Sequence, residues 1–196
     1  MLAREPNDFV SRHLFDNVPF IFDGDFSSWI TWRASLAGML EVDPREVVLT
    51  GSACVGFSLS PDKNFRAFDH TSDVDVGVIS AYHFDQAWRH LRQQRVSWML
   101  IDRRTRQAIE QHRKNYVFAG TIATDRMLGI LPFGKNWQAA LDLMGEQAPT
   151  KGREIKLRIY RDYDALRYYQ ASSIRGLQAK ISAPEIADEQ PIPEED

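Results

Sequence analysis

Apolar positions in the first half of the chain follow a helical period up to about residue 40 and a strand period after residue 46. The first period predicts a helix over residues 27–40, capped by Ser27 or Ser28 and ended by Asp43-Pro44, because the residue before a proline avoids helical geometry. We interpret its apolar face as core, formed by Trp29, Trp32, Leu36 and Met39 or Leu40. Two buried strands should follow, over residues 46–50 and around Val74, Val76 and Val78.

The pattern in the second half of the chain predicts four further helices and one strand. The helices are expected over residues 81–95, over 102–116 with Asp102 as the cap, and over 136–144, and a last helix should run from a cap at Asp162 to about residue 180. Residues 154–160 alternate strictly and predict a half-buried strand. Its apolar face is Ile155, Leu157 and Ile159, and its polar face is Glu154, Lys156, Arg158 and Tyr160. Glycines and prolines make the rest of residues 117–150 difficult to interpret.

These elements predict one α/β domain over residues 27–181. Residues 1–26 contain five phenylalanines and several turn formers, and we expect an extension that packs over the domain with a short helix near residues 9–15. Residues 182–196 contain three prolines and six acids, which is typical of a flexible tail or a docking segment. A hydrophobic fraction of 43% and a charged fraction of 26% in 196 residues are those of an ordinary globular protein.

The sequence shows no disulfide pair, no secretory leader and no membrane span, and we therefore expect a cytoplasmic location. Cys54 is the single cysteine, which excludes an internal disulfide and fits a reducing compartment. The first residues include Arg4, Glu5 and Asp8 and show no secretory leader. No apolar run approaches the length of a membrane span.

Positive charge is concentrated in residues 89–114, which hold eight lysines and arginines against only Asp102 and Glu110. This segment is either a solvated helical face or an electrostatic platform for RNA or an acidic partner protein. The oligomeric state is left open by the sequence.

Two short pieces carry candidate chemistry. Gly51-Ser52 follows the first predicted strand, where glycine lets the backbone approach a phosphate and the hydroxyl adds a donor. Asp73 and Asp75 lie two residues apart within the second strand, so both point to one face, roughly 6.5–7 Å apart at Cα. Such paired carboxylates attract a cation, and oxygen ligands suit Mg²⁺ or Mn²⁺.

The order of these elements, with Leu49-Thr50-Gly51-Ser52 and Ser72-Asp73-Val74-Asp75-Val76 in their places, resembles the nucleotidyltransferase fold of the DNA polymerase β superfamily. The resemblance covers residues 28–95, with a weaker continuation to residue 160. It implies a mixed β-sheet flanked by helices. It also implies that Gly51 and Ser52 hold the triphosphate of an NTP, with ATP as the expected nucleotide, and that Asp73 and Asp75 bind two Mg²⁺ ions.

The chain departs from the family pattern in two places. Members usually carry a third carboxylate on the next core strand, and Glu154 is the best-placed candidate for this catalytic and metal-binding role, ahead of Asp125 and Asp162. Its neighbours Lys156 and Arg158 either bind phosphate or mark a lost metal ligand. The loop before Asp73 is also long. Its basic residues either cover the phosphates or belong to a solvated insertion; they are Lys63, Arg66 and His70.

The expected function is Mg²⁺-dependent transfer of a nucleoside monophosphate from an NTP to an acceptor hydroxyl. By the resemblance, that acceptor is a protein side chain, a tRNA end or a small molecule, in the setting of a toxin–antitoxin or antiphage system. The alternative is a catalytically degenerate domain that binds a nucleotide or RNA and regulates a partner protein.

Overall fold

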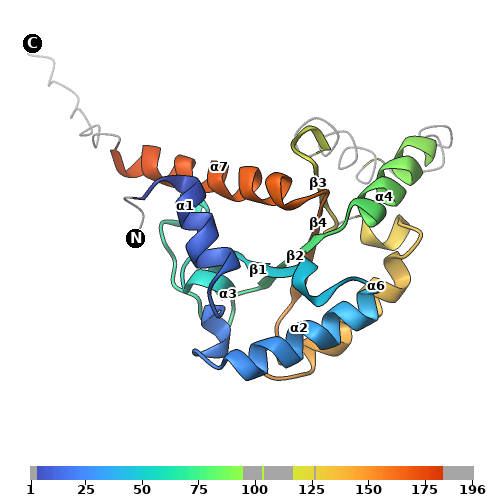
Figure 1. Ribbon diagram of the computed structural model, residues 1–196, viewed down its shortest axis with the longest axis horizontal. Coiled ribbons are helices and arrows are strands. Elements are labelled where there is room, and N and C mark those ends of the chain that lie inside the picture. Colours follow the sequence, from blue (N-terminus) through green and yellow to red (C-terminus); the bar gives the residue numbers. More distant parts are fainter. Residues whose placement is uncertain (1–3, 95–102, 104–116, 126, 183–196) are drawn as a thin grey trace, which may run out of the picture.

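A computed structural model describes residues 4–94, 103, 117–125 and 127–182 (Figure 1). Several expectations lie outside these residues. They are the helix over residues 102–116, most of the basic segment and the acidic tail after residue 182. Within the described part, no helix is both long enough and apolar enough to cross a membrane.

The centre of the molecule is a four-stranded mixed sheet in the order β1-β2-β4-β3. β1 pairs antiparallel with β2, β2 pairs parallel with β4, and β3 pairs antiparallel with β4. The strands are β1 (Val47–Thr50), β2 (Val74–Ile79), β3 (Thr121–Ala123) and β4 (Ile155–Tyr160). The predicted mixed α/β architecture is therefore confirmed, and β3 is an element that the sequence did not reveal.

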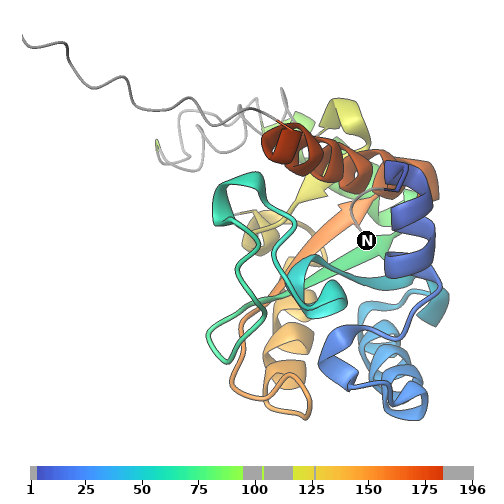
Figure 2. The ribbon, with the colours of Figure 1, turned by 90° about the vertical axis from the view of Figure 1, so that its left-hand side faces the viewer.

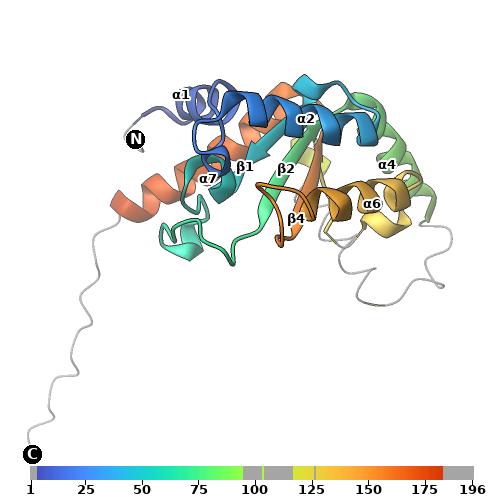
Figure 3. The ribbon, with the colours of Figure 1, turned by 90° about the horizontal axis from the view of Figure 1, so that it is seen from below.

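Helices lie on both sides of the sheet (Figures 1 and 2). α2 and α6 pack together on one side, and α7 crosses the other side with α1 against it; Figure 3 shows α2 beside α6 from below. The α-helices are α1 (Pro6–Val10), α2 (Phe26–Leu40), α3 (Gly51–Val55), α4 (Ala81–Gln94), α6 (Gly134–Gly145) and α7 (Tyr163–Ser182). A π-helical turn, Ser11–Phe15, and short 3₁₀ turns complete the described part; these turns are Phe20–Phe22, Pro44–Glu46, Pro61–Lys63, Val117–Ala119 and Leu128–Ile130.

The first long helix keeps its predicted face but not its predicted ends. Trp29, Trp32, Leu36 and Leu40 are buried as expected. The cap is Asp25, whose Oδ1 accepts a hydrogen bond from Ser28 N at 3.0 Å, so the assignment of Ser27 or Ser28 as cap was wrong. The helix also ends before Asp43-Pro44, because Glu41 turns left-handed with φ 56°. Asp43 instead caps the next 3₁₀ turn.

The predicted strand over residues 154–160 is confirmed as β4, with Ile155, Leu157 and Ile159 buried. Its last residue differs from the prediction. Tyr160 is fully buried rather than solvent-facing, and its hydroxyl accepts a hydrogen bond from Gln170 Nε2 of α7 at 3.2 Å. α7 covers this end of the strand, and the predicted cap of α7 is confirmed, since Asp162 Oδ1 accepts from Ala165 N at 2.8 Å.

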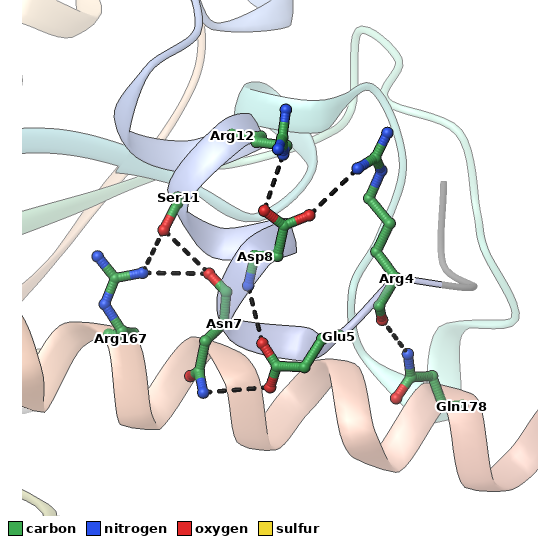
Figure 4. Close-up of polar contacts among 8 residues, drawn as sticks. All are labelled: Arg4, Glu5, Asn7, Asp8, Ser11, Arg12, Arg167 and Gln178. Atoms are coloured by element: carbon green, nitrogen blue, oxygen red, sulfur yellow. Dashed lines mark hydrogen bonds and ion pairs between the residues drawn. The ribbon is translucent and has the colours of Figure 1, made fainter.

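The N-terminal segment is attached to α7 by polar contacts (Figure 4). Gln178 Nε2 donates to the carbonyl oxygen of Arg4 at 2.8 Å, and Arg167 Nη1 donates to the carbonyl oxygen of Asn7 at 3.1 Å. These bonds tie the first described turn to two positions along α7. Phe9 and Val10 are fully buried beneath them, so this segment contributes to the core.

Replacing Thr150 with valine should lower the free energy of unfolding by about 1–3 kcal/mol, because a buried donor loses its partner. The fully buried Thr150 hydroxyl accepts from Trp32 Nε1 at 3.1 Å and donates to the Met144 carbonyl oxygen at 2.6 Å, so it joins α2 to α6. Urea unfolding measures the loss. The matched control is Thr31→Val on the exposed side of α2, expected within about 0.5 kcal/mol of wild type. Equal effects of the two substitutions would contradict this role for Thr150.

Candidate functional site

The Gly51-Ser52 turn and the Asp73/Asp75 pair meet at the end of β1. Thr50, the last residue of β1, is the register partner of Asp75 on β2, so the turn after Thr50 lies directly beside that carboxylate. A cavity of about 290 Å³ opens here. Its polar lining includes Gly51, Ser52, Ser60, Lys63, Asp75 and Arg158. The Gly51-Ser52 turn and Asp75 therefore border one cavity, whereas Asp73 is not part of its lining.

Gly51 is required by its contact with Asp75. Its φ is +62°, a left-handed conformation that side chains rarely adopt. A Cβ atom at this position would lie 2.6 Å from Asp75 Oδ2, closer than a real contact allows. Glycine therefore lets the carboxylate of β2 pack against the turn.

Asp75 lies on β2, whereas Asp73, predicted within the strand, precedes β2 by one residue, and both lie near Lys156 of β4. The parallel register sets Asp75 opposite Lys156 and Gly77 opposite Arg158. Lys156 Nζ lies 2.5 Å from Asp73 Oδ2 and 3.6 Å from Glu154 Oε2. The hydrogen bond to Asp73 and the nearby carboxylate charges raise the pKa of Lys156, which keeps the ammonium charged. The carboxylates of Asp73 and Asp75 thus lie across from the basic side chains of Lys156 and Arg158 on the neighbouring strand.

Asp75 is the more enclosed carboxylate of the pair. Burial raises its pKa, the positive charges of Arg158 and Lys156 oppose that rise, and the negative charges of Asp73 and Asp125 add to it. Among the described residues, its carboxylate has no hydrogen-bond or ion-pair partner. Its oxygens are therefore available to a ligand in the cavity.

Arg158 is held in place by α7. Its guanidinium lies 4.9 Å from the ring centroid of Tyr169 and donates a hydrogen bond to the Tyr169 hydroxyl. The Tyr169 ring also meets Tyr160 edge-on at 6.0 Å. The cation–π contact and the packing of the two rings hold the Arg158 side chain in the wall of the cavity.

Of the three basic loop residues considered as phosphate contacts, one lines the cavity. Phe57 bridges Ala67, and Ser58 N donates to the Arg66 carbonyl oxygen at 2.8 Å, so the loop folds back as a small hairpin. Lys63, at its tip, lines the cavity. Arg66 lies outside the lining, and its Nη2 reaches Ser72 Oγ at 3.5 Å. His70, the third basic residue of the loop, is exposed and also lies outside the lining.

Arg153 is a positioning residue that sequence reasoning missed. Its Nη1 donates to the carbonyl oxygens of Asp69 and Ser72, at 2.5 Å and 2.9 Å, and its guanidinium lies 4.5 Å from the Phe68 ring centroid. It thereby connects the end of the loop to the beginning of β4. No local pattern marks this role, because its partners are more than 80 residues away in the sequence.

Glu154 and Asp125 flank the carboxylate pair from two other segments. Glu154 precedes β4, and its carboxylate reaches Asp73 only through Lys156. Asp125 follows β3 and lines the cavity together with Asp75. Within the described residues, no three His, Cys, Asp or Glu side chains are placed to hold a metal ion together. The prediction of Glu154 as a third metal ligand therefore gains no support from this geometry.

A second cavity of about 490 Å³ adjoins the first and shares Asp125, Lys156 and Leu157 with it. Its other wall is formed by α6, with Gln138 and Asp142, and by Glu146 directly after that helix. Lys156 and Asp125 thus stand at the junction between a mainly cationic and hydroxyl-lined cavity and a more acidic one.

The donor set fits a divalent cation in part. Asp75 on β2 and Asp73 just before it offer carboxylate oxygens, the ligand type that Mg²⁺ prefers. The ammonium of Lys156, however, already neutralises Asp73. While Lys156 stays on Asp73 Oδ2, a metal ion at the carboxylate pair would meet a positive charge that opposes its binding.

Gly51→Ala should destabilise the protein by at least about 1–2 kcal/mol, because alanine is strained at a left-handed φ and its Cβ would displace Asp75. Gly38→Ala, in α2 with open space around the position, is the matched control and should be neutral or stabilising by up to about 1 kcal/mol. Chemical unfolding compares the two. A Gly51→Ala variant as stable as wild type would show that the turn does not need glycine.

Asp75→Asn should raise the free energy of unfolding at neutral pH in the presence of EDTA. Because burial raises the pKa of Asp75, wild type loses stability as pH rises through that pKa, and asparagine removes this loss. The advantage of the variant should shrink as pH falls from 7 to 4. Urea unfolding across this range measures it, with Asp85→Asn on the exposed side of α4 as control. A pH-independent difference would contradict the assignment.

Comparisons with protein-family models, with curated proteins and with solved structures find no match to this chain.

Proposed function

We propose that the mixed sheet is a nucleotidyltransferase fold and that the 290 Å³ cavity binds the triphosphate of an NTP. The observation that carries the proposal is the meeting of the Gly51-Ser52 turn with Asp75 at one cavity, beside the cations Lys63, Lys156 and Arg158. Phosphate oxygens are recognised by hydroxyls, backbone N–H groups and charged donors. This cavity provides hydroxyls, from Ser52 and Ser60, and charged donors, from Lys63, Lys156 and Arg158.

In the proposed reaction, an acceptor hydroxyl attacks the α-phosphorus of the NTP and pyrophosphate leaves. Asp73 and Asp75 would hold Mg²⁺, which in such sites stabilises charge on the transferring phosphoryl group. Lys63 and Arg158 would hold the phosphates that leave. ATP remains the expected nucleotide.

The adjoining 490 Å³ cavity is the proposed place of the acceptor. It shares Lys156 and Asp125 with the first cavity, so an acceptor bound there would lie beside these two residues. Asp125 is suited to accept the proton of the attacking hydroxyl. Whether the acceptor is a protein side chain, a tRNA end or a small molecule, and the toxin–antitoxin or antiphage setting, stay predictions, as does the cytoplasmic location.

The second candidate is a catalytically inactive nucleotide-binding domain that regulates a partner. One observation favours it: the polar face of β4 carries Lys156 and Arg158 beside the two carboxylates, where a metal site would use further acids. In that function, the cations of β4 would replace the metal in neutralising bound phosphate. The two candidates share the nucleotide site and differ in turnover.

Incubation with each α-labelled NTP, Mg²⁺ and a lysate of the source cells tests the first candidate. Wild type should label a discrete acceptor, and Asp73→Asn/Asp75→Asn should lower labelling by roughly 100-fold or more, because several kcal/mol of charge stabilisation is lost. Asp85→Asn is the matched control and should label like wild type.

Equal labelling by wild type and the double variant would refute a catalytic role for the pair. ATP binding without any labelling, measured by calorimetry, would favour the second candidate. Absence of ATP binding with and without Mg²⁺ would refute both.

A further inference from the structure

Lys156 lines both cavities, and its ammonium contacts Asp73, one of the two carboxylates that a metal ion would use. Its ammonium is 2.5 Å from Asp73 Oδ2 and 3.6 Å from Glu154 Oε2, and its side chain lines both cavities. One protein cation thus serves two carboxylates. Asp75, the register partner of Lys156, keeps its own carboxylate without a hydrogen-bond or ion-pair partner among the described residues.

We propose that Lys156 is a built-in counter-ion that withholds Asp73 from metal until a phosphate ligand draws the ammonium away. The proposal rests on the proposed function, since it requires an NTP in the 290 Å³ cavity. Lys156 exchanges one anionic partner, the Asp73 carboxylate, for another, the ligand phosphate. The carboxylate released by this exchange then joins Asp75 as a metal ligand.

The contact of Lys156 with Asp73 is suited to exchange. Both side chains remain about one-third exposed, at 35% and 36%, so water can replace either partner and the pair is held weakly. A lysine also carries its charge on a flexible stem. A phosphate offers several charged oxygens in place of one carboxylate oxygen, which makes it a strong competitor for the ammonium.

Arg158 provides the contrast within the same strand. It is fixed by its cation–π contact and hydrogen bond to Tyr169. It therefore cannot follow a ligand in the way that Lys156 can. Of the two β4 cations in the cavity lining, Lys156 is the one that moves.

The exchange makes nucleotide and metal binding depend on one another. With Lys156 on Asp73, the carboxylate pair offers a metal one negative charge fewer, and the ammonium repels the ion directly. A nucleotide that takes Lys156 removes both obstacles. By thermodynamic linkage, bound metal must then increase the affinity for nucleotide by the same factor by which bound nucleotide increases the affinity for metal.

The first measurement is Mn²⁺ binding to the nucleotide-free protein, followed by the EPR signal of free Mn²⁺. Lys156→Gln should bind Mn²⁺ at least about tenfold more tightly than wild type, because the repelling charge is gone. Lys156→Arg keeps the charge and should bind like wild type. Adding Asp73→Asn to Lys156→Gln should abolish the gain, and thermal melting verifies that each variant is folded.

The second measurement is ATP binding in EDTA by calorimetry. Here Lys156→Gln should bind about tenfold more weakly than wild type, because the phosphate loses its ammonium partner. Opposite shifts of Mn²⁺ and ATP affinity in the same variant are the expected signature of exchange.

Each other outcome overturns the proposal. Equal Mn²⁺ affinity of Lys156→Gln and wild type would show that Lys156 does not withhold Asp73. A gain with Lys156→Arg as large as with Lys156→Gln would show that size rather than charge is responsible. An ATP affinity of Lys156→Gln equal to that of wild type would show that the ammonium does not move to the phosphate, although the proposed nucleotide site would stand. A wild type that binds no ATP under any condition would instead refute the proposed function itself.

Discussion

The candidate site depends on the parallel pairing of β2 with β4. This single register sets Asp75 opposite Lys156 and lets Lys156 reach Asp73, so a pair of carboxylates becomes an alternating set of charges. Parallel strands need a long connection between them, and here that connection contains α4, β3 and α6. The chemistry of the site is therefore fixed by residues some 80 positions apart.

Compensation of charge explains why the site can exist without disrupting the sheet. Two carboxylates two residues apart next to a buried core would repel each other and lose hydration. Lys156 balances Asp73 directly, while Arg158 lies close enough to oppose the rise that burial causes in the pKa of Asp75. The same compensation weakens the attraction for a metal ion. Binding of a ligand in this cavity is thus a competition between partners that are already present.

The surroundings of the cavity are organised by longer-range contacts. Arg153, just before β4, is bonded to the chain that follows the hairpin of Lys63, at Asp69 and Ser72, and α7 supplies Tyr169 to hold Arg158. The N-terminal segment is in turn bonded to α7 at Arg167 and Gln178. The segment that begins the chain therefore supports the helix that closes one side of the cavity.

Local patterns predicted a large part of this molecule. The apolar stripe of α2, the buried faces of β2 and β4, the cap of α7, the turn at Gly51-Ser52 and the place of Asp75 in β2 all follow from short-range spacing, whereas Asp73 lies one residue before the strand. β3 was missed because it has three residues and takes its stability from pairing with β4 rather than from its own sequence. Asp125, which follows it, was for that reason difficult to place.

The amino-acid sequence by itself determined which residues share a face and where the two short motifs lie, because those properties depend on the period of a helix or strand. Only the tertiary structure decided which charges face one another. Lys156 was visible from the start as a basic neighbour of Glu154, but its contact with Asp73 depends on strand order and register. Register is set by the packing of the whole sheet against its helices, and no local pattern contains it.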